Sequence, residues 1–240
     1  MLAALVAGQD DPAAIAGLAR GKLRKKIPEL KRAFHGHVME HHPFMLEQWL
    51  DHLALLEEQI SRFNDRIEEA LRPFLGEQTF DRLDIIPGVN RVTIENVVAE
   101  IGVDMHQFPS AEHLASWAGL CPGNEESAGK RKRRRTTKGN VWLRRALCEA
   151  AWAAGRSKDT YFKAQYRRLA GRRGKKQAIV AVAHSLLDVF YHLLKNDNLE
   201  YHELGGNYFD TLDPIRLWRH LVKRLESLGY MVTLTERKAA

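Results

Sequence analysis

The strongest constraint on the fold is a regular spacing of apolar residues in the first third of the chain. From Leu46 to Ala70 they recur at alternating intervals of three and four: Leu46, Trp49, Leu53, Leu56, Ile60, Phe63, Ile67 and Ala70. This spacing keeps one narrow apolar stripe along a helix. It is typical of a coiled coil, formed either as an antiparallel pair within the chain or between protomers. A helix that lies on the chain's own core fits the pattern equally well.

The remainder of the sequence also favours helices. The 240 residues are 45% hydrophobic and 28% charged, which is enough for one or two cores. We therefore expect a mainly α fold, in which a long coiled-coil segment is followed by a helical domain. The expected divisions are a linker or remnant at 1–27, coiled-coil helices at 28–75, the helical domain at 76–195, and a C-terminal helix and tail at 196–240. Residues Met231 to Leu234 predict a short strand in that tail.

The charge distribution favours an anionic partner. The net charge is +7, and the cations gather in three blocks, Arg20–Arg32, Lys130–Lys138 and Arg167–Lys176. Blocks of this kind indicate nucleic acid before membrane. Cys121 and Cys148 have no metal-binding or disulfide spacing, so we expect reduced thiols and a cytoplasmic protein. The apolar opening of the chain is too short for a signal peptide or a membrane span.

A glycine-rich loop that contains one serine runs into the second basic block. Ser127 stands between Glu126 and Ala128, and seven of the nine residues from Lys130 to Lys138 are Lys or Arg. Ala128 and Gly129, which follow Ser127, give a bulky partner access to the hydroxyl, and the cations attract a polyanion. One interpretation is therefore a serine held close to a phosphodiester. The other is a basic loop in which Ser127 only fills a turn.

The segment from Leu83 to Gly102 predicts two short helices around a tight turn. The turn contains Pro87, Gly88, Val89 and Asn90. It resembles the helix-hairpin-helix motif, whose hairpin offers backbone N–H groups to a DNA phosphate. Asn90 stands where the motif usually has a second glycine, and asparagine tolerates the left-handed conformation. A plain helical hairpin is the alternative.

Histidines are frequent before the long helix, and His37 with His41 has a spacing that can hold a metal. No third ligand is identifiable, so we expect no metal site. On the expected core helix from Gln177 to Lys195, His184 is interpreted as a satisfied core histidine. In the Ala-rich helix that ends at Ala154, four residues are expected to pack: Trp142, Leu143, Leu147 and Trp152.

Several motifs taken together resemble one family. They are Ile85-Ile86-Pro87-Gly88-Val89, Ala99-Glu100-Ile101-Gly102, Phe108-Pro109-Ser110, the run from Leu114 to Asn124, Glu126-Ser127-Ala128-Gly129-Lys130, Lys138-Gly139-Asn140 with Trp142-Leu143-Arg144, and Arg172-Arg173-Gly174-Lys175-Lys176. They cover most of residues 80 to 195. The chain resembles the C-terminal part of transposases of the insertion-sequence one-ten family, the bridge-RNA-guided serine recombinases.

The resemblance implies a DNA strand-transfer enzyme in which Ser127 matches the nucleophilic serine. It implies DNA and a guide RNA as partners, and the coiled coil favours a homo-oligomer. The residues expected to contact nucleic acid are Pro87, Gly88, Val89, Asn90, Lys130, Arg131, Lys132, Arg133, Arg134, Arg135, Lys138, Arg144, Arg172, Arg173, Lys175 and Lys176. The sequence does not assign which of these cations stabilise charge at the reacting phosphate.

Family members also carry an N-terminal domain whose acidic residues hold magnesium near the serine. No such domain is recognisable in this chain, so we expect a truncated protein with no cofactor of its own, which binds nucleic acid without completing recombination. Two other functions stay open. One is a non-catalytic DNA- or RNA-binding protein that modulates a full-length transposase, and the other is a structural coiled-coil protein.

Overall fold

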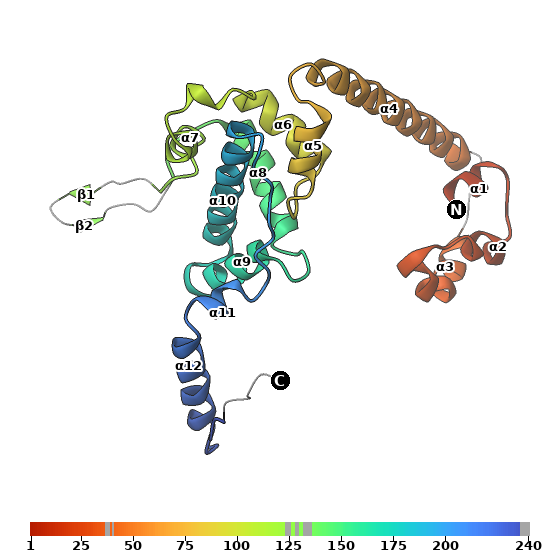
Figure 1. Cartoon of the computed structure of the whole chain (residues 1–240). Helices are drawn as coiled ribbons and strands as arrows, with labels where there is room; N and C mark the ends of the chain where they lie inside the picture. Colours follow the sequence, from red (N-terminus) through yellow and green to blue (C-terminus); the bar gives the residue numbers. More distant parts are fainter. Residues whose placement is uncertain (37–38, 40, 123–125, 128–129, 132–135, 236–240) are drawn as a thin grey trace. The chain divides into compact units, whose positions relative to one another are not determined.

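The computed structural model describes residues 1–36, 39, 41–122, 126–127, 130–131 and 136–235 (Figure 1). Its elements are mainly helical, which confirms the predicted fold class. The chain divides into two compact units, residues 1–70 and residues 71–240. Each unit is described by itself.

The first unit begins with short helices. They are α1 (Leu2–Val6), α2 (Pro12–Gly17), the 3-10 helix η1 (Gly21–Lys26) and α3 (Ile27–Phe34). The Asp11 carboxylate caps α2, because it accepts hydrogen bonds from the backbone N–H groups of Ala13 and Ala14 at 2.9 and 3.1 Å. Ile15 and Ala16 on α2 are buried. Pro28 lies in the first turn of α3, as the sequence predicts.

Helix α4 (His41–Leu71) carries the heptad stripe. It has 31 residues, or about 46 Å at 1.5 Å per residue, and none of them is buried. Large apolar side chains stand exposed along it: Phe44, Met45, Trp49, Leu53, Leu55, Leu56, Ile60, Phe63 and Ile67. The long helix is where the sequence predicts it. No described residue buries the stripe, so the coiled coil stays a prediction.

The second unit is built around α10. Its elements are α5 (Glu77–Asp84), α6 (Arg91–Ile101), η2 (Met105–Gln107), α7 (Ala111–Trp117), β1 (Glu126–Ser127), β2 (Lys130–Arg131), α8 (Val141–Ala154), α9 (Tyr161–Arg173), α10 (Lys175–Lys195), α11 (Tyr208–Leu212) and α12 (Pro214–Ser227). Helix α10 packs against α5, α7, α8 and α9 (Figure 1). By length and composition α10 could cross a membrane, but half of its apolar stretch is buried inside this unit. Burial of that extent is typical of a core helix.

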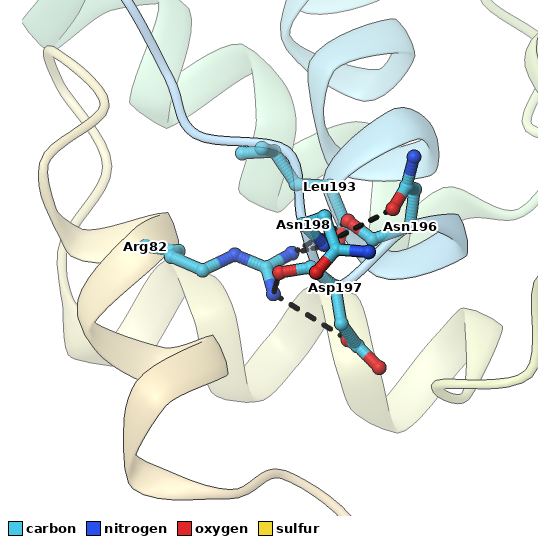
Figure 2. A network of polar contacts seen from close by, with 5 residues as sticks. All are labelled: Arg82, Leu193, Asn196, Asp197 and Asn198. Carbon is cyan, nitrogen blue, oxygen red and sulfur yellow. Dashed lines mark hydrogen bonds and ion pairs between the residues drawn. The ribbon is translucent and has the colours of Figure 1, made fainter.

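Arg82 on α5 ties this helix to the end of α10 (Figure 2). Its guanidinium donates to the backbone carbonyls of Leu193, Asn196 (3.1 Å) and Asp197 (2.7 Å). The last carbonyls of a helix have no partner within the helix, so a cation that donates to them satisfies them and interacts favourably with the helix dipole. The Arg82 side chain is only 14% exposed. This contact fixes the first helix of the predicted hairpin against the central helix.

The end of the chain differs from one expectation. Helix α12 begins after Asp213, whose carboxylate accepts a hydrogen bond from the Arg216 N–H at 3.0 Å, as the Asp-Pro pair predicts. The strand predicted at Met231–Leu234 is wrong, because these residues have no regular structure. Met231 is 98% exposed, so no neighbouring strand or apolar surface stabilises an extended segment there.

Substitution of Arg82 tests the link between α5 and α10. We expect Arg82→Ala to lower the free energy of unfolding by about 2 kcal/mol or more, because hydrogen bonds from a charged donor are lost and partly buried carbonyls are left unpaired. Arg145→Ala is the matched control, since among the described residues Arg145 pairs with Glu149 alone and its side chain is 70% exposed. That change should cost less than about 1 kcal/mol. Equal losses in urea unfolding would contradict the role given to Arg82.

Candidate nucleic-acid interface

The predicted helical hairpin is present as α5, a turn and α6. Leu83, Ile86 and Ile94 are fully buried and fix the pair of helices in the core. The Val89 N–H donates to the Ile86 carbonyl at 3.0 Å, and the Val89 side chain is buried. This amide is therefore engaged within the turn. The part of the hairpin that can face a phosphate is the beginning of α6.

Gly88 in this turn faces another helix. It has φ +84°, and a Cβ at this position would lie 2.6 Å from the Ala150 carbonyl oxygen and 2.7 Å from the Ala154 Cα. Both residues belong to the C-terminal part of α8. Gly88 is thus required by a positive φ and by the close approach of two backbones. The turn is fixed to α8 by this contact.

Asn90 does not adopt the left-handed conformation that would let it replace a second glycine in the turn. It is extended, with φ −139° and ψ 174°, so the predicted left-handed conformation is wrong. Its side-chain oxygen accepts hydrogen bonds from the Thr93 N–H and the Thr93 hydroxyl, both at 2.9 Å. Asn90 is therefore the N-cap of α6. The turn needs only one left-handed residue, and Gly88 supplies it.

Ser127 lies in a short β hairpin. Strand β1 pairs with β2 in the antiparallel sense, with Glu126 opposite Arg131 and Ser127 opposite Lys130. Pro122 and Thr136 form a further antiparallel bridge. The expectation of a loop without strands is corrected by this pairing. Residues 132–135 of the basic run, Lys132, Arg133, Arg134 and Arg135, lie outside the described residues.

The base of this hairpin is a contact between two glycines. A Cβ on Gly119, which has φ +69°, would lie 2.7 Å from the Gly139 nitrogen and 2.8 Å from the Thr137 carbonyl oxygen. Only residues without a side chain allow the two backbones to approach so closely. Gly119 follows α7 and Gly139 precedes α8. The segment that carries Ser127 therefore leaves and re-enters the domain at one point.

Asn140 fixes the helix that follows the hairpin. Its side-chain oxygen accepts hydrogen bonds from the N–H groups of Trp142 and Leu143 at 2.9 and 3.0 Å, which caps α8. Its amide nitrogen donates to the Glu100 carboxylate on α6 at 2.5 Å. A residue with both a donor and an acceptor is needed for these two roles. Asn140 thereby links the beginning of α8 to the end of α6.

Comparison with known proteins relates part of this unit to transposases. Residues 81–167 match the model of the transposase IS116/IS110/IS902 family. The match extends from α5 through both hairpins into α9. This segment is thus similar to the transposase domain of that family.

Three curated proteins are similar to the chain. The transposase for insertion sequence element IS1111A of Coxiella burnetii is 35% identical over 121 residues, which are 47% of this chain and 32% of that protein. The pilin gene-inverting proteins of Moraxella bovis and Moraxella lacunata are 28% and 29% identical, and each match covers 63% of this chain and 46% of the relative. The chain thus spans less than half the length of these relatives.

Five further cations of the predicted set are exposed in the second unit. Arg172 and Arg173 end α9, Lys175 and Lys176 begin α10, and all four are exposed at this corner. Lys138 is exposed at the hairpin base. Arg144 is different, because it is partly buried and its side chain contacts the Cys148 thiol. Among the predicted cations whose side chains the structure describes, Arg144 alone is partly buried in the domain.

Both cysteine thiols have raised pKa values. Burial raises the pKa of the Cys148 thiol, although Arg144 acts in the opposite direction. Burial also raises the pKa of the Cys121 thiol, which lies near the base of the hairpin. A raised pKa leaves less thiolate at neutral pH. On α10, His184 pairs with Asp188 at 3.3 Å, and this contact raises the pKa of His184.

Two tryptophans of α8 are not the packing residues that the sequence predicts. Leu143 and Leu147 are fully buried, whereas Trp142 is 68% exposed and Trp152 is 41% exposed. Trp152 contacts Tyr166 and lies under the Arg156 guanidinium. The core side of α8 is filled by Ala150, Ala151 and Ala154, because close backbone contacts leave no room for indoles.

Other contacts of the domain could not be assigned from the sequence alone. The Arg82 contact joins residues more than 100 positions apart, and no local pattern predicts it. The Asn140 cap follows a Gly-Asn pair before an apolar run, which is a recognisable helix start. The sequence shows that Gly119 and Gly139 flank the serine segment, but it does not show that these two glycines are in contact.

Gly88 and Gly174 provide a matched test of the hairpin contact. Both have φ near +85°, but a Cβ on Gly174 would meet nothing within 4 Å. Both alanine variants place a side chain at a positive φ, but only the Cβ of the Gly88 variant also meets backbone atoms. We expect Gly88→Ala to lower the free energy of unfolding by about 1–3 kcal/mol more than Gly174→Ala, since its Cβ collides with α8. Equal losses in denaturant titrations would contradict the contact.

Proposed function

We propose that the chain acts in DNA recombination as the serine-bearing part of a transposase. The observation that carries the proposal is the pairing of Ser127 with Lys130 in a hairpin whose base is fixed between α7 and α8. It lies within the segment that matches the transposase family. Directly opposite residues of an antiparallel pair are close neighbours. Among the described residues of the basic run, the register pairs the backbone of Lys130 with that of Ser127.

The proposed chemistry is nucleophilic. The Ser127 hydroxyl gives its proton to a base, and its oxygen attacks a DNA phosphorus. The bond between that phosphorus and one sugar oxygen breaks, and this oxygen takes up a proton and leaves as a free hydroxyl. A covalent phosphoserine then joins the protein to the other DNA end. Serine is a weak nucleophile at neutral pH, and the phosphate gains charge in the transition state. Lys130 stabilises this charge. Carboxylates that hold magnesium belong to a separate domain in this proposal, so the chain alone binds DNA and does not complete strand exchange.

The proposed DNA contacts lie at both ends of α8. The turn around Gly88 is fixed to the C-terminal part of this helix, and the serine hairpin is fixed at its beginning. Fourteen helical residues separate the two by about 20 Å. The start of α6 then holds a phosphate away from the reacting one, as a helix-hairpin-helix would. The exposed cations at the corner of α9 and α10 add contacts to DNA or to a guide RNA.

We further propose that the stripe on α4 joins two copies of the chain as a coiled coil. A stripe of this length exposes apolar side chains that a partner helix would bury. The ion pair of Glu58 with Arg62 lies on the outside of the helix. The alternative function, a non-catalytic protein that binds nucleic acid and joins full-length transposase subunits, uses the same stripe but does not need Ser127.

Ser127→Ala separates the catalytic from the non-catalytic function. The substrate is DNA with bridging phosphorothiolates, since a thiolate leaves with less help from an acid or a metal. We expect the unmodified chain to form a DNA adduct that survives SDS, and Ser127→Ala to form none. Binding should be equal in both and should weaken steeply as salt rises. An adduct that persists in Ser127→Ala, or none in either protein, would rule out this nucleophile.

Efficient strand exchange by the chain alone with magnesium, donor and target DNA and guide RNA would contradict the division between domains.

Ile60→Lys tests self-association through α4. Ile60 is an exposed stripe residue, and a charge buried in the seam would weaken association roughly tenfold or more. Gln59→Lys introduces the same charge on the neighbouring position outside the stripe and should have little effect. Sedimentation velocity distinguishes the two. A monomeric unmodified chain, or equal association of both variants, would contradict the coiled coil.

A further inference from the structure

Two exposed tryptophans flank the base of the serine hairpin. Trp117 ends α7 two residues before Gly119, and Trp142 lies in the first turn of α8 three residues after Gly139. Because Gly119 and Gly139 are in contact, both tryptophan Cα atoms lie within about 12 Å of one point. Their exposures are 45% and 68%. The two exposed indoles therefore belong to residues close to the point where the hairpin leaves the domain.

Trp142 is exposed because its helix is fixed on the other side. Leu143 and Leu147 bury the core face of α8, and Asn140 holds the beginning of the helix against Glu100. Trp142 cannot turn toward the core without breaking this cap. Among the described residues no aromatic ring or cation stacks on it, whereas Trp152 of the same helix contacts Tyr166 and Arg156. Its indole is an open stacking surface.

The charges around Trp142 match nucleic acid. Lys138 precedes it, and Arg145 lies three positions after it, on the same side of the helix. In the part of the chain that the structure describes, Arg145 is held by one exposed ion pair, with Glu149, which contributes little and can be exchanged for a phosphate contact. The beginning of a helix also favours negative charge. An aromatic surface between cations is the combination that binds unpaired nucleotides.

We propose that Trp142, with Trp117 also close to the hairpin base, stacks on unpaired nucleobases next to the site of Ser127. The inference rests on the proposed function, because it takes nucleic acid as the partner. It adds the form of that partner: single-stranded or locally opened nucleotides. Stacking needs an exposed base face, which the interior of a duplex does not offer. A nucleic acid that the protein contacts only through phosphates and sugars would not need these indoles.

Binding of the full chain to labelled oligonucleotides tests the proposal. The probes are oligothymidylate and oligouridylate of about twelve nucleotides and a duplex of the same length. We expect Trp142→Ala to weaken binding to the single strands about 5- to 100-fold, and Trp142→Phe to retain most of it, because a π face remains. Binding to the duplex should change less than about twofold, and the salt dependence should stay the same, since no phosphate contact is lost.

The control is Trp218→Ala, which removes an exposed indole from α12 and should leave all three probes unaffected. Thermal unfolding of Trp142→Ala should match that of the unmodified chain. If Trp142→Ala loses affinity equally for oligothymidylate and oligouridylate, both DNA and RNA can occupy the surface. If it loses affinity for one of them, the surface binds that nucleic acid.

Two results would overturn the proposal and are distinguishable from each other. If single-strand binding is unchanged in Trp142→Ala, or falls as much as duplex binding does, the stacking surface is wrong while the proposed function stands. If the unmodified chain binds none of the probes at low salt, the proposed function fails as well.

Discussion

The arrangement of the second unit depends on close backbone contacts at the two ends of α8. At one end Gly88 touches Ala150 and Ala154, and at the other Gly119 touches Gly139, just before the helix cap. Any side chain at these positions would force the segments apart. These contacts fix a helical hairpin and a serine-bearing β hairpin to one helix. Helix α10 then supports α8 and is itself tied to α5 through Arg82.

These contacts explain how the glycine-rich segment that carries Ser127 is attached to the domain. The segment around Ser127 is rich in glycine and cations, and such a composition has no core of its own. Its two ends are joined at one point, and its strands pair with Ser127 opposite Lys130. The proposed nucleophile is therefore presented from a fixed base, with exposed indoles and cations beside it. In the proposed function these surfaces hold the nucleic acid near the serine.

The sequence was informative where the signals were local. The stripe on α4, the Asp-Pro start of α12 and the core face of α10 follow from spacing and capping residues, and the structure has them. Predictions from the sequence were wrong where contacts between distant residues determine the local structure. Trp142 was predicted to pack, but the glycine and alanine contacts of α8 leave it outside. Asn90 was assigned a left-handed role that Gly88 fills, and Met231–Leu234 lacks the neighbouring strand that a sheet requires.

The most direct test of the account is the identity of the amino acid that becomes joined to DNA. The covalent product formed on phosphorothiolate DNA is digested with protease and nuclease, and the peptide that keeps a nucleotide is sequenced by mass spectrometry. The account predicts one modified peptide, with the nucleotide on Ser127. A nucleotide on another residue of the chain, or on Cys121 or Cys148, would contradict the central claim.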